Sequence, residues 1–291
     1  IAETVRHRDR FGPVSQEELA ALSGKETELW IQTKNGYCVH VFEERPEALP
    51  DRAPILLNFH GGGFLKGRTD RERRYCCAVM EATNALVWDV DYSLAPEKPF
   101  PYAAEESYGI IQYVFEHAEE LCIDPEKIML AGHSAGGNLV ASALVKNAET
   151  KAFHPSCALM EYFPTDNTAN PVERLSEELK QDPFWVKRAE TEKLYTDFYV
   201  GDADASDPCC SPAFATEQVL AAFPDCLILS AGEDSLRDDT ENFGMRLVKA
   251  GVCVTMQRIP EAMHGFTTNR TPGWERALEL HDRFFLEHIN R

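Results

Sequence analysis

Hydrophobic residues gather in short runs along this chain, separated by longer stretches with helical spacing. The first two runs, 28–33 and 37–42, flank Asn35-Gly36, a dipeptide typical of two-residue turns, and they predict a β-hairpin. Later runs are apolar without strict alternation, as in strands buried on both faces of a parallel sheet. These runs are 55–59, 85–90, 128–131, 157–163, 226–231 and 252–259.

The stretches between these runs repeat apolar residues every three or four positions, which predicts helices. They are residues 75–83, 103–121, 137–146, 240–249 and 272–289. Regular alternation of strand and helix predicts an α/β fold, with a mostly parallel eight-stranded sheet and helices on both faces.

Two segments interrupt this alternation. Residues 1–27, with a predicted helix over 16–22, precede the first strand, and residues 165–213 form a polar insertion with scattered aromatic residues. We expect them to pack together as a small helical cap over the carboxyl edge of the sheet, where α/β proteins bind ligands. The core would then comprise residues 28–164 and 214–291. The alternative is a pair of surface helices without substrate contact.

The charge balance excludes several classes of partner. The chain has 29 Lys and Arg against 48 Asp and Glu, a formal net charge of −19, which argues against binding nucleic acid or an anionic membrane. Arg68, Arg71, Arg73 and Arg74 are interspersed with acidic residues, which indicates a solvated helix face. No apolar run approaches the roughly 20 residues of a membrane span, and residues 1–10 do not resemble a signal peptide.

The number and spacing of the cysteines indicate the redox state of the cellular compartment in which the protein is expected. There are nine, an odd number, and none forms the C-x-x-C pair of zinc or redox sites. Cys157 and Cys226 lie inside apolar runs, where a thiol behaves as a small hydrophobic group. We therefore expect reduced thiols and a cytoplasmic protein.

Residues 132–136, Gly-His-Ser-Ala-Gly, follow a predicted strand and lead into a predicted helix. This is the G-x-S-x-G nucleophile elbow, in which a tight turn exposes the serine hydroxyl. Taken alone, the pattern also fits an ordinary turn, but the strand and helix around it favour Ser134 as a nucleophile.

Residues 60–64, His-Gly-Gly-Gly-Phe, follow another predicted strand. Successive glycines let backbone N–H groups approach a ligand, here the oxyanion of a tetrahedral intermediate. The expected donors are Gly62, Gly63 and Ala135. A phosphate loop is disfavoured because its Lys-Ser/Thr pair is absent, and a flexible loop is the remaining alternative.

A nucleophilic serine needs a base and an orienting carboxylate. His264 follows the last strand run in a glycine-containing loop, and its place after Ser134 matches the chain order of this architecture. Asp234, just past the run 226–231, is the preferred acid. Asp238 and Asp239 are interpreted as helix-capping residues, Glu233 stands one residue early, and Asp166 is a more distant alternative.

Together these motifs resemble the hormone-sensitive-lipase-like family of α/β-hydrolase esterases. The resemblance rests on residues 60–64, 91–97 with Phe100-Pro101, 132–138, 234–239 and 264–266. It implies an α/β-hydrolase fold with nucleophile Ser134, acid Asp234, base His264, and oxyanion donors Gly62, Gly63 and Ala135. It also implies hydrolysis of carboxylic esters, commonly of short acyl chains, without metal or cofactor. Residues 1–27 and 165–213 match the family's cap.

The chain departs from the family pattern at three positions. His133 replaces an acidic residue, Ser93 replaces an arginine and Ser235 replaces a proline. These changes affect the expected substrate preference and local rigidity, and leave the predicted chemistry in place.

The expected partner is a small ester, with a homodimer as a further possibility. Five aromatic residues are candidates for a small apolar pocket, or equally for cap or core packing: Phe64, Phe184, Trp185, Phe214 and Phe266. Two alternative functions stay open. One is a peptidase or amidase on the same fold. The other is a non-catalytic binder resembling plant gibberellin receptors, which lack the histidine present here as His264.

Overall fold

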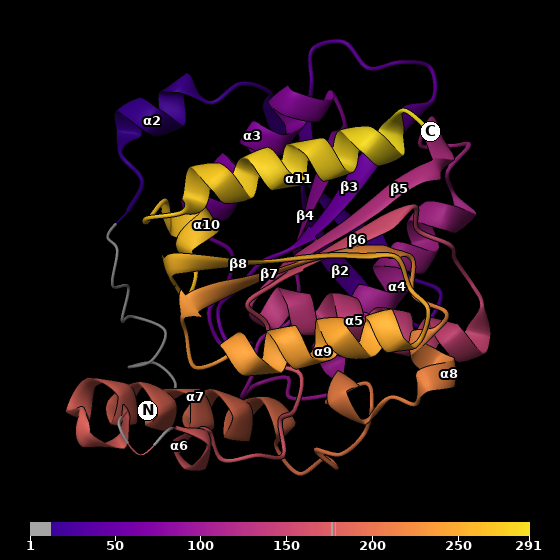
Figure 1. Ribbon diagram of the computed structural model, residues 1–291. Helices are drawn as coiled ribbons and strands as arrows, with labels where there is room; N and C mark the ends of the chain where they lie inside the picture. Colours follow the sequence, from indigo (N-terminus) through magenta and orange to yellow (C-terminus); the bar gives the residue numbers. More distant parts are fainter. Residues whose placement is uncertain (1–12, 176, 178) are drawn as a thin grey trace.

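The predicted strands form one sheet in the computed structural model, which describes residues 13–175, 177 and 179–291 (Figure 1). The order is β1-β2-β4-β3-β5-β6-β7-β8. Strand β2 runs antiparallel to β1 and β4, and the other neighbours are parallel. The eight predicted strands and the mostly parallel sheet are therefore confirmed. Their bounds are β1 Lys25–Gln32, β2 Cys38–Arg45, β3 Ala53–Phe59, β4 Leu86–Asp91, β5 Ile123–His133, β6 Cys157–Glu161, β7 Asp225–Glu233 and β8 Val254–Met263.

Helices cover both faces of the sheet, as Figure 1 shows. One face carries α3 (Asp70–Thr83), α10 (Phe266–Asn269) and α11 (Trp274–Ile289). The other carries α4 (Tyr102–Glu116), α5 (Ala135–Thr150), α8 (Glu217–Leu220) and α9 (Arg237–Lys249). Each layer buries its own apolar cluster against the sheet, which explains why the central strands are apolar on both faces.

Helix α4 is shorter than predicted, ending at Glu116 instead of residue 121. Turns follow it, with Leu121 N–H bonded to the His117 carbonyl and Cys122 at φ 58°. Ala118 and Leu121 still pack on the core from these turns. Apolar spacing alone therefore could not separate the end of the helix from the turns after it.

The described parts of the two segments, around residues 16–21 and 183–200, lie on opposite sides of the molecule. The predicted first helix is confirmed as α2 (Gln16–Ala21), which begins with a capping box between Ser15 and Glu18. A 3.2 Å ion pair from Glu18 to Arg74 holds α2 beside α3. In Figure 1, α2 lies far from α6 (Pro171–Arg174) and α7 (Pro183–Val200). The expected packing of the two segments is thus wrong for residues 13–27, and residues 1–12 lie outside the described residues.

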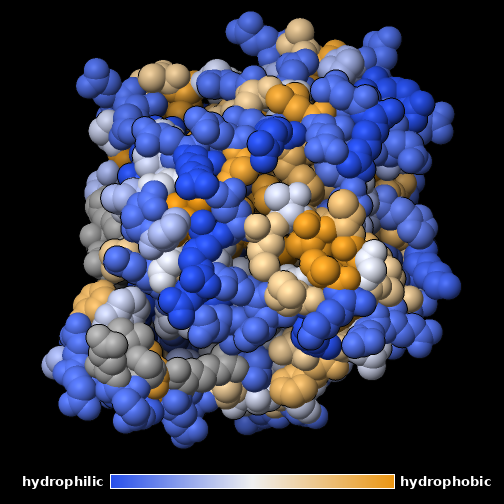
Figure 2. Space-filling model, in the orientation of Figure 1, coloured by the Kyte–Doolittle hydropathy of each residue, from blue (hydrophilic) through white to orange (hydrophobic). Residues whose placement is uncertain are grey.

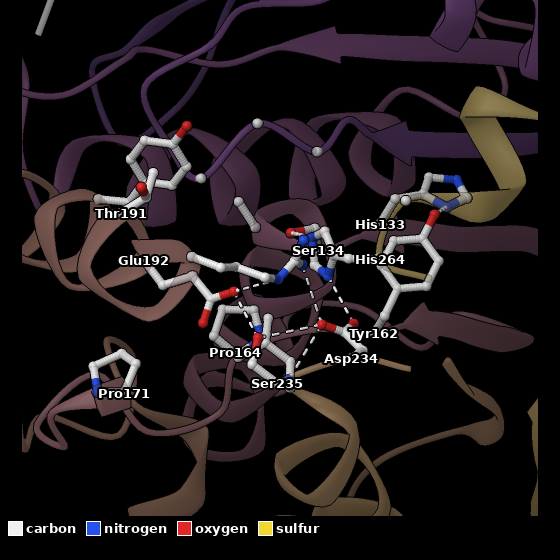
Figure 3. A pocket seen from close by; sticks show the side chains of 18 of the residues that line it. His133, Ser134, Tyr162, Pro164, Pro171, Thr191, Glu192, Asp234, Ser235 and His264 are labelled. Carbon is white, nitrogen blue, oxygen red and sulfur yellow. Dashed lines mark hydrogen bonds and ion pairs between the residues drawn. The ribbon is translucent and has the colours of Figure 1, made fainter. Parts of the chain in front are cut away.

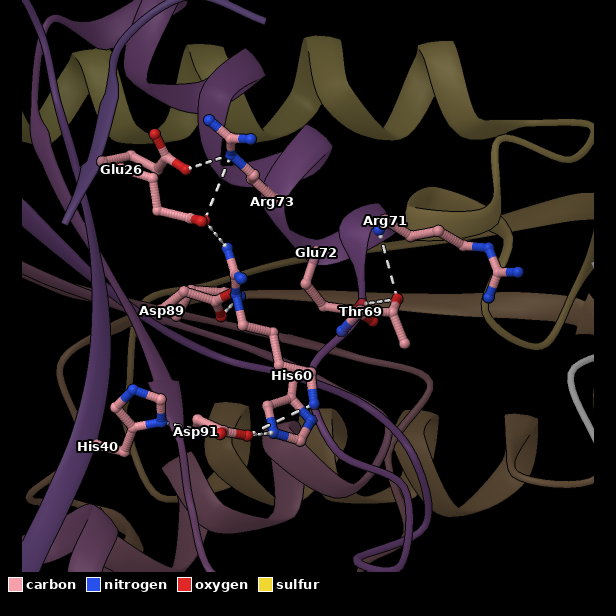
Figure 4. A network of polar contacts seen from close by, with 12 residues as sticks. Glu26, His40, His60, Thr69, Arg71, Glu72, Arg73, Asp89 and Asp91 are labelled. Carbon is pink, nitrogen blue, oxygen red and sulfur yellow. Dashed lines mark hydrogen bonds and ion pairs between the residues drawn. The ribbon is translucent and has the colours of Figure 1, made fainter. Parts of the chain in front are cut away.

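Arg68, Arg73 and Arg74, at or just before the start of α3, are ion-paired, so the prediction of a solvated helix face is wrong for these three arginines. Acidic side chains of the neighbouring strands face this end of the helix (Figure 4). Because these acids come from β1, β2, β4 and α2, the pairing could not be seen in the local sequence. The pairs are Arg68 with Asp89 and Glu26, Arg73 with Glu44 and Glu26, and Arg74 with Glu18.

The structure leaves all nine cysteines as free thiols. Cys157 and Cys226 are fully buried in β6 and β7, which confirms them as small core residues. Among the helices of the described residues, none is long and apolar enough to cross a bilayer.

Candidate active site

Ser134 occupies the sharp turn from β5 into α5. Its backbone has φ 54° and ψ −118°, a conformation rare for a residue with a side chain. The turn closes because its glycines lack side chains: a Cβ on Gly136 would overlap the Phe59 carbonyl oxygen, and one on Gly132 would overlap the Gly136 backbone. The predicted nucleophile elbow is therefore present, with Ser134 9% exposed at the mouth of a pocket.

His264 and Asp234 come from the loops after β8 and β7 and meet Ser134 (Figure 3). Ser134 Oγ lies 2.8 Å from His264 Nε2, and His264 Nδ1 lies 2.7 Å from Asp234 Oδ2. An ionised carboxylate only accepts hydrogen bonds, so the Nδ1 proton is donated to Asp234. Nε2 of a neutral imidazole is then free to accept the Ser134 hydroxyl proton. The structure thus brings all three predicted residues into one hydrogen-bonded chain.

Asp234 is held as a buried anion. Burial opposes its charge, but His264 and, more weakly, Arg188 and the Leu236 N–H lower the pKa of the carboxyl below its usual value. Arg188 and Leu236 N–H both donate to Oδ1, at 3.3 Å each. Asp234 Oδ2 therefore accepts the hydrogen bond from His264, while Oδ1 accepts hydrogen bonds from separate donors.

The other acidic candidates have different places. Asp166 accepts from Thr168 N–H and its hydroxyl, and Glu233 is the last residue of β7. The capping prediction for Asp238 and Asp239 is wrong, because α9 begins at Arg237 and Leu236 occupies the N-cap position. Both aspartates lie in the first helical turn.

The glycine loop 61–63 lies beside Ser134 along the pocket wall. Within the part of the chain that the structure describes, no protein acceptor takes a hydrogen bond from the N–H groups of Gly62, Gly63 or Ala135. Gly63 has φ 61°, and a Cβ there would overlap the Tyr195 ring. These amides border the space in front of the Ser134 hydroxyl.

The pocket has a volume of about 1060 Å³ and lies between these loops and the 165–213 insertion. Of the five aromatic candidates, Phe64 and Phe184 line it. The insertion also supplies polar side chains that the sequence interpretation missed, Arg188 and Glu192 on α7 among them. Their four-residue spacing on a predicted polar insertion was the available signal, since it places both on one helix face.

Three of the aromatic candidates do not line this pocket. Phe266 is fully buried, and its ring centroid lies 5.4 Å from that of Tyr162. Phe214, in the short helix η2 (Pro212–Phe214), is 45% exposed elsewhere on the surface. Trp185 follows Phe184 on α7, and the two rings meet edge-on with their centroids 5.3 Å apart.

Comparison with known proteins places this geometry in a family. A family model described as alpha/beta hydrolase fold, Abhydrolase_3, matches residues 56–268. Esterase LipI of Mycobacterium tuberculosis is 32% identical over 223 residues, which cover 76% of this chain and 68% of LipI. The chain belongs to the Abhydrolase_3 family. The predicted family resemblance is confirmed, and the chain is a carboxylic ester hydrolase.

Two further similar proteins extend the match over most of the chain. Ethyl acetate hydrolase of Pseudomonas putida is 30% identical over 265 residues, 86% of this chain and 80% of that protein. The crystal structure of carboxyl esterase 2 from the mycorrhizal fungus Tuber melanosporum has a TM-score of 0.85 at 26% identity, covering 99% of this chain and 96% of that one. The fold similarity therefore includes the insertion as well as the sheet.

Behind the elbow, this Abhydrolase_3 member buries a carboxylate between two imidazoles. Glu161, fully buried at the end of β6, accepts from His133 Nδ1 at 2.7 Å and from His281 Nε2 at 2.8 Å. Thr267 adds a third donor at 3.1 Å. Burial opposes the charge of Glu161, but the attraction of His281 and the two imidazole hydrogen bonds outweigh it and hold the pKa of the carboxyl well below its usual value. His133, one of the three departures from the family pattern, thus has a buried acidic partner.

Glu161→Gln is expected to lower the free energy of unfolding at pH 7 by about 3–5 kcal/mol, because it leaves buried donors without their charged acceptor. A carboxyl whose pKa is lower in the folded state stabilises above its unfolded pKa of about 4.3, and that contribution is lost as pH falls below it. The difference in free energy of unfolding between wild type and variant should therefore become smaller below about pH 4.3. Urea denaturation at pH 7, 5 and 3.5 measures this, with the exposed Glu126→Gln as control. A gap of the same size at all three pH values would contradict the prediction.

Proposed function

We propose that this enzyme hydrolyses esters of short acyl chains by acyl transfer through a Ser134–His264–Asp234 triad. The observation that carries the proposal is the hydrogen-bonded chain from Ser134 Oγ through His264 to the buried Asp234, which opens onto the pocket. The spacing of 2.8 and 2.7 Å suits proton transfer from the nucleophile to a neighbouring base.

In the first step, His264 Nε2 takes the Ser134 hydroxyl proton while Oγ attacks the ester carbonyl carbon. The carbonyl oxygen becomes an anion, which the N–H groups of Gly62, Gly63 and Ala135 stabilise. Asp234 holds the imidazole tautomer and stabilises the imidazolium. His264 then gives its proton to the leaving alkoxide, which departs as the alcohol and leaves an acyl-serine.

In the second step, water attacks the acyl-serine with His264 again as base. The collapsing intermediate releases the carboxylic acid, and the proton on His264 returns to Ser134 Oγ. Each cycle consumes one ester and one water and regenerates the enzyme.

The short-acyl preference is supported by the lining of the pocket and by one relative. A long alkyl chain in this cavity would remove water from exposed polar side chains of its wall, Lys187 and Asp238 among them, without replacing the lost hydrogen bonds, which is unfavourable. The relative named ethyl acetate hydrolase points in the same direction. A non-catalytic binding role is disfavoured because the histidine base is present and aligned.

The acyl preference is tested with p-nitrophenyl acetate, butyrate and decanoate. We expect kcat/KM for decanoate to be roughly tenfold or more below that for butyrate, owing to the desolvated polar groups. The matching p-nitroanilides, run beside the esters, separate an esterase from an amidase. A decanoate rate equal to or above the butyrate rate would contradict the short-acyl proposal, and faster anilide turnover would favour the amidase.

A further inference from the structure

One face of helix α7 touches both loops that shape the active site. The residues at 188, 192, 195 and 199 are spaced by four, three and four positions, so they share a face of the helix. The first two contact the loop that carries Asp234, and the last two contact the glycine loop. This arrangement joins two parts of the site that are far apart in the sequence.

At the first end, Arg188 and Glu192 form a polar cluster with the Asp234 loop. Figure 3 shows Glu192 facing Ser235 and Asp234. The Arg188 guanidinium donates to Asp234 Oδ1 at 3.3 Å, and its Nε lies 3.1 Å from Glu192 Oε1. Ser235, at the family's proline position, donates to the same Glu192 oxygen at 2.6 Å. The side chains of Arg188 and Glu192 are only 19% and 17% exposed, so the cluster is largely removed from water.

At the second end, two tyrosines pack on the glycine loop. The Tyr195 ring occupies the space that a Cβ on Gly63 would need. The buried Tyr199 ring stacks on Phe64 with a centroid separation of 3.6 Å and an interplanar angle of 8°. Phe64 has φ 62°, so this stacking helps to hold a backbone conformation that a phenylalanine rarely adopts.

We propose that α7 is a fixed support of the catalytic site and that Arg188 is a positioning residue acting through Asp234. The inference rests on the proposed function, since it needs Asp234 and His264 to be the acid and base of the reaction. Bonds to both carboxylate oxygens fix the rotation of the carboxyl group, so that Oδ2 stays aligned with His264 Nδ1.

The charge of Arg188 also acts on the base. A cation near the Asp234–His264 pair disfavours a second cation on the imidazole, whereas Glu192 favours it. His264 is faced by Asp234 from the loop after β7, by Arg188 and Glu192 from α7, by the Tyr162 ring at 5.1 Å after β6, and by Ser134. Asp238, Asp239 and Arg237 of α9, Lys187 of α7 and Arg71 of α3 line the same pocket. Arg188 is the cation that donates directly to Asp234, so its removal should shift the acid limb of the pH profile to higher pH.

The experiment compares Arg188→Met, Glu192→Gln and Lys193→Met in kcat/KM for p-nitrophenyl acetate from pH 5 to 9. In Arg188→Met the acid limb, which is the fall of kcat/KM at low pH, should shift to higher pH by about 0.5–1 pH unit, and kcat should be roughly tenfold lower. In Glu192→Gln the limb should move down by a similar amount. Lys193→Met removes a cation from the same helix, where Lys193 pairs with Asp197 and its side chain is 41% exposed, and should leave the limb in place. Active-site titration corrects each rate for the fraction of folded enzyme.

The opposite directions separate positioning from a merely structural role. A lower kcat in Arg188→Met with an unmoved acid limb would overturn the proposal. If Arg188→Met does not fold, Glu192→Gln provides the test by itself. An acid limb that stays in place or shifts to higher pH in Glu192→Gln would overturn the proposal. A failure of the proposed function would look different, because the wild-type enzyme would then lack Ser134-dependent turnover at every pH.

Discussion

Ser134→Ala is expected to reduce kcat for p-nitrophenyl acetate by roughly 10⁵–10⁶-fold. The substitution removes the only atom of the side chain that can attack the ester, and His264 is left with no hydroxyl to deprotonate. The residual rate should come from the amides of Gly62, Gly63 and Ala135 and from substrate binding, which still act on a water attack. The measurement is steady-state turnover together with the initial burst of p-nitrophenol, which should disappear.

Alanine keeps the Cβ of Ser134, so the strained turn and the fold should be preserved, and an unchanged melting temperature checks this. Ser156→Ala is the matched control, since that hydroxyl donates to the Ile128 carbonyl at 3.1 Å and is not among the pocket-lining residues. It should retain wild-type turnover. Equal rates for Ser134→Ala and wild type would exclude Ser134 as the nucleophile.

Asp234→Asn is expected to reduce kcat by roughly 10⁴-fold with little change in structure. If the new amide donates to His264 Nδ1, the imidazole proton must move to Nε2, which then points a donor at Ser134. The base can no longer accept the hydroxyl proton, and the anion that stabilises the imidazolium is also gone. Turnover of p-nitrophenyl acetate at pH 7 and 8 measures the loss.

A second aspartate–histidine pair provides the control for Asp234→Asn. Asp225 Oδ2 lies 3.2 Å from His288 Nε2, and neither residue is among those that line the pocket. Asp225→Asn removes the same charge from the same type of pair and should leave kcat near the wild-type value. The triad proposal would be wrong if Asp234→Asn kept most of its activity, or if both variants lost activity equally.

Much of the fold and of the candidate site could be predicted from local sequence. The elbow 132–136 could be predicted because a tight strand-to-helix turn admits only glycine at its crowded positions, and the structure has backbone atoms where those side chains would be. The strands could be predicted because a parallel sheet buried on both faces requires uninterrupted apolar runs. The helix predicted over 16–22 is present as α2. Each of these features depends on residues that are close together in the sequence, so the local sequence predicts it.

Partners across the fold could not be predicted in the same way. The Arg68–Arg74 cluster was predicted to be solvated because its acidic partners lie on three separate strands and on α2, far away in the sequence. Trp185, Phe214 and Phe266 looked like pocket residues because aromatic composition does not say which way a ring faces.

The sequence by itself determined the strand and helix order, the elbow and the residues suited to acyl transfer, since each depends on backbone sterics or side-chain chemistry within a few positions. Only the tertiary structure decided that His264 and Asp234 meet Ser134, that Arg188 binds Asp234, and that Glu161 lies between His133 and His281. Those contacts join residues from 28 to 130 positions apart. Their free energy depends on distance and burial, and both arise only when the sheet and helices pack together.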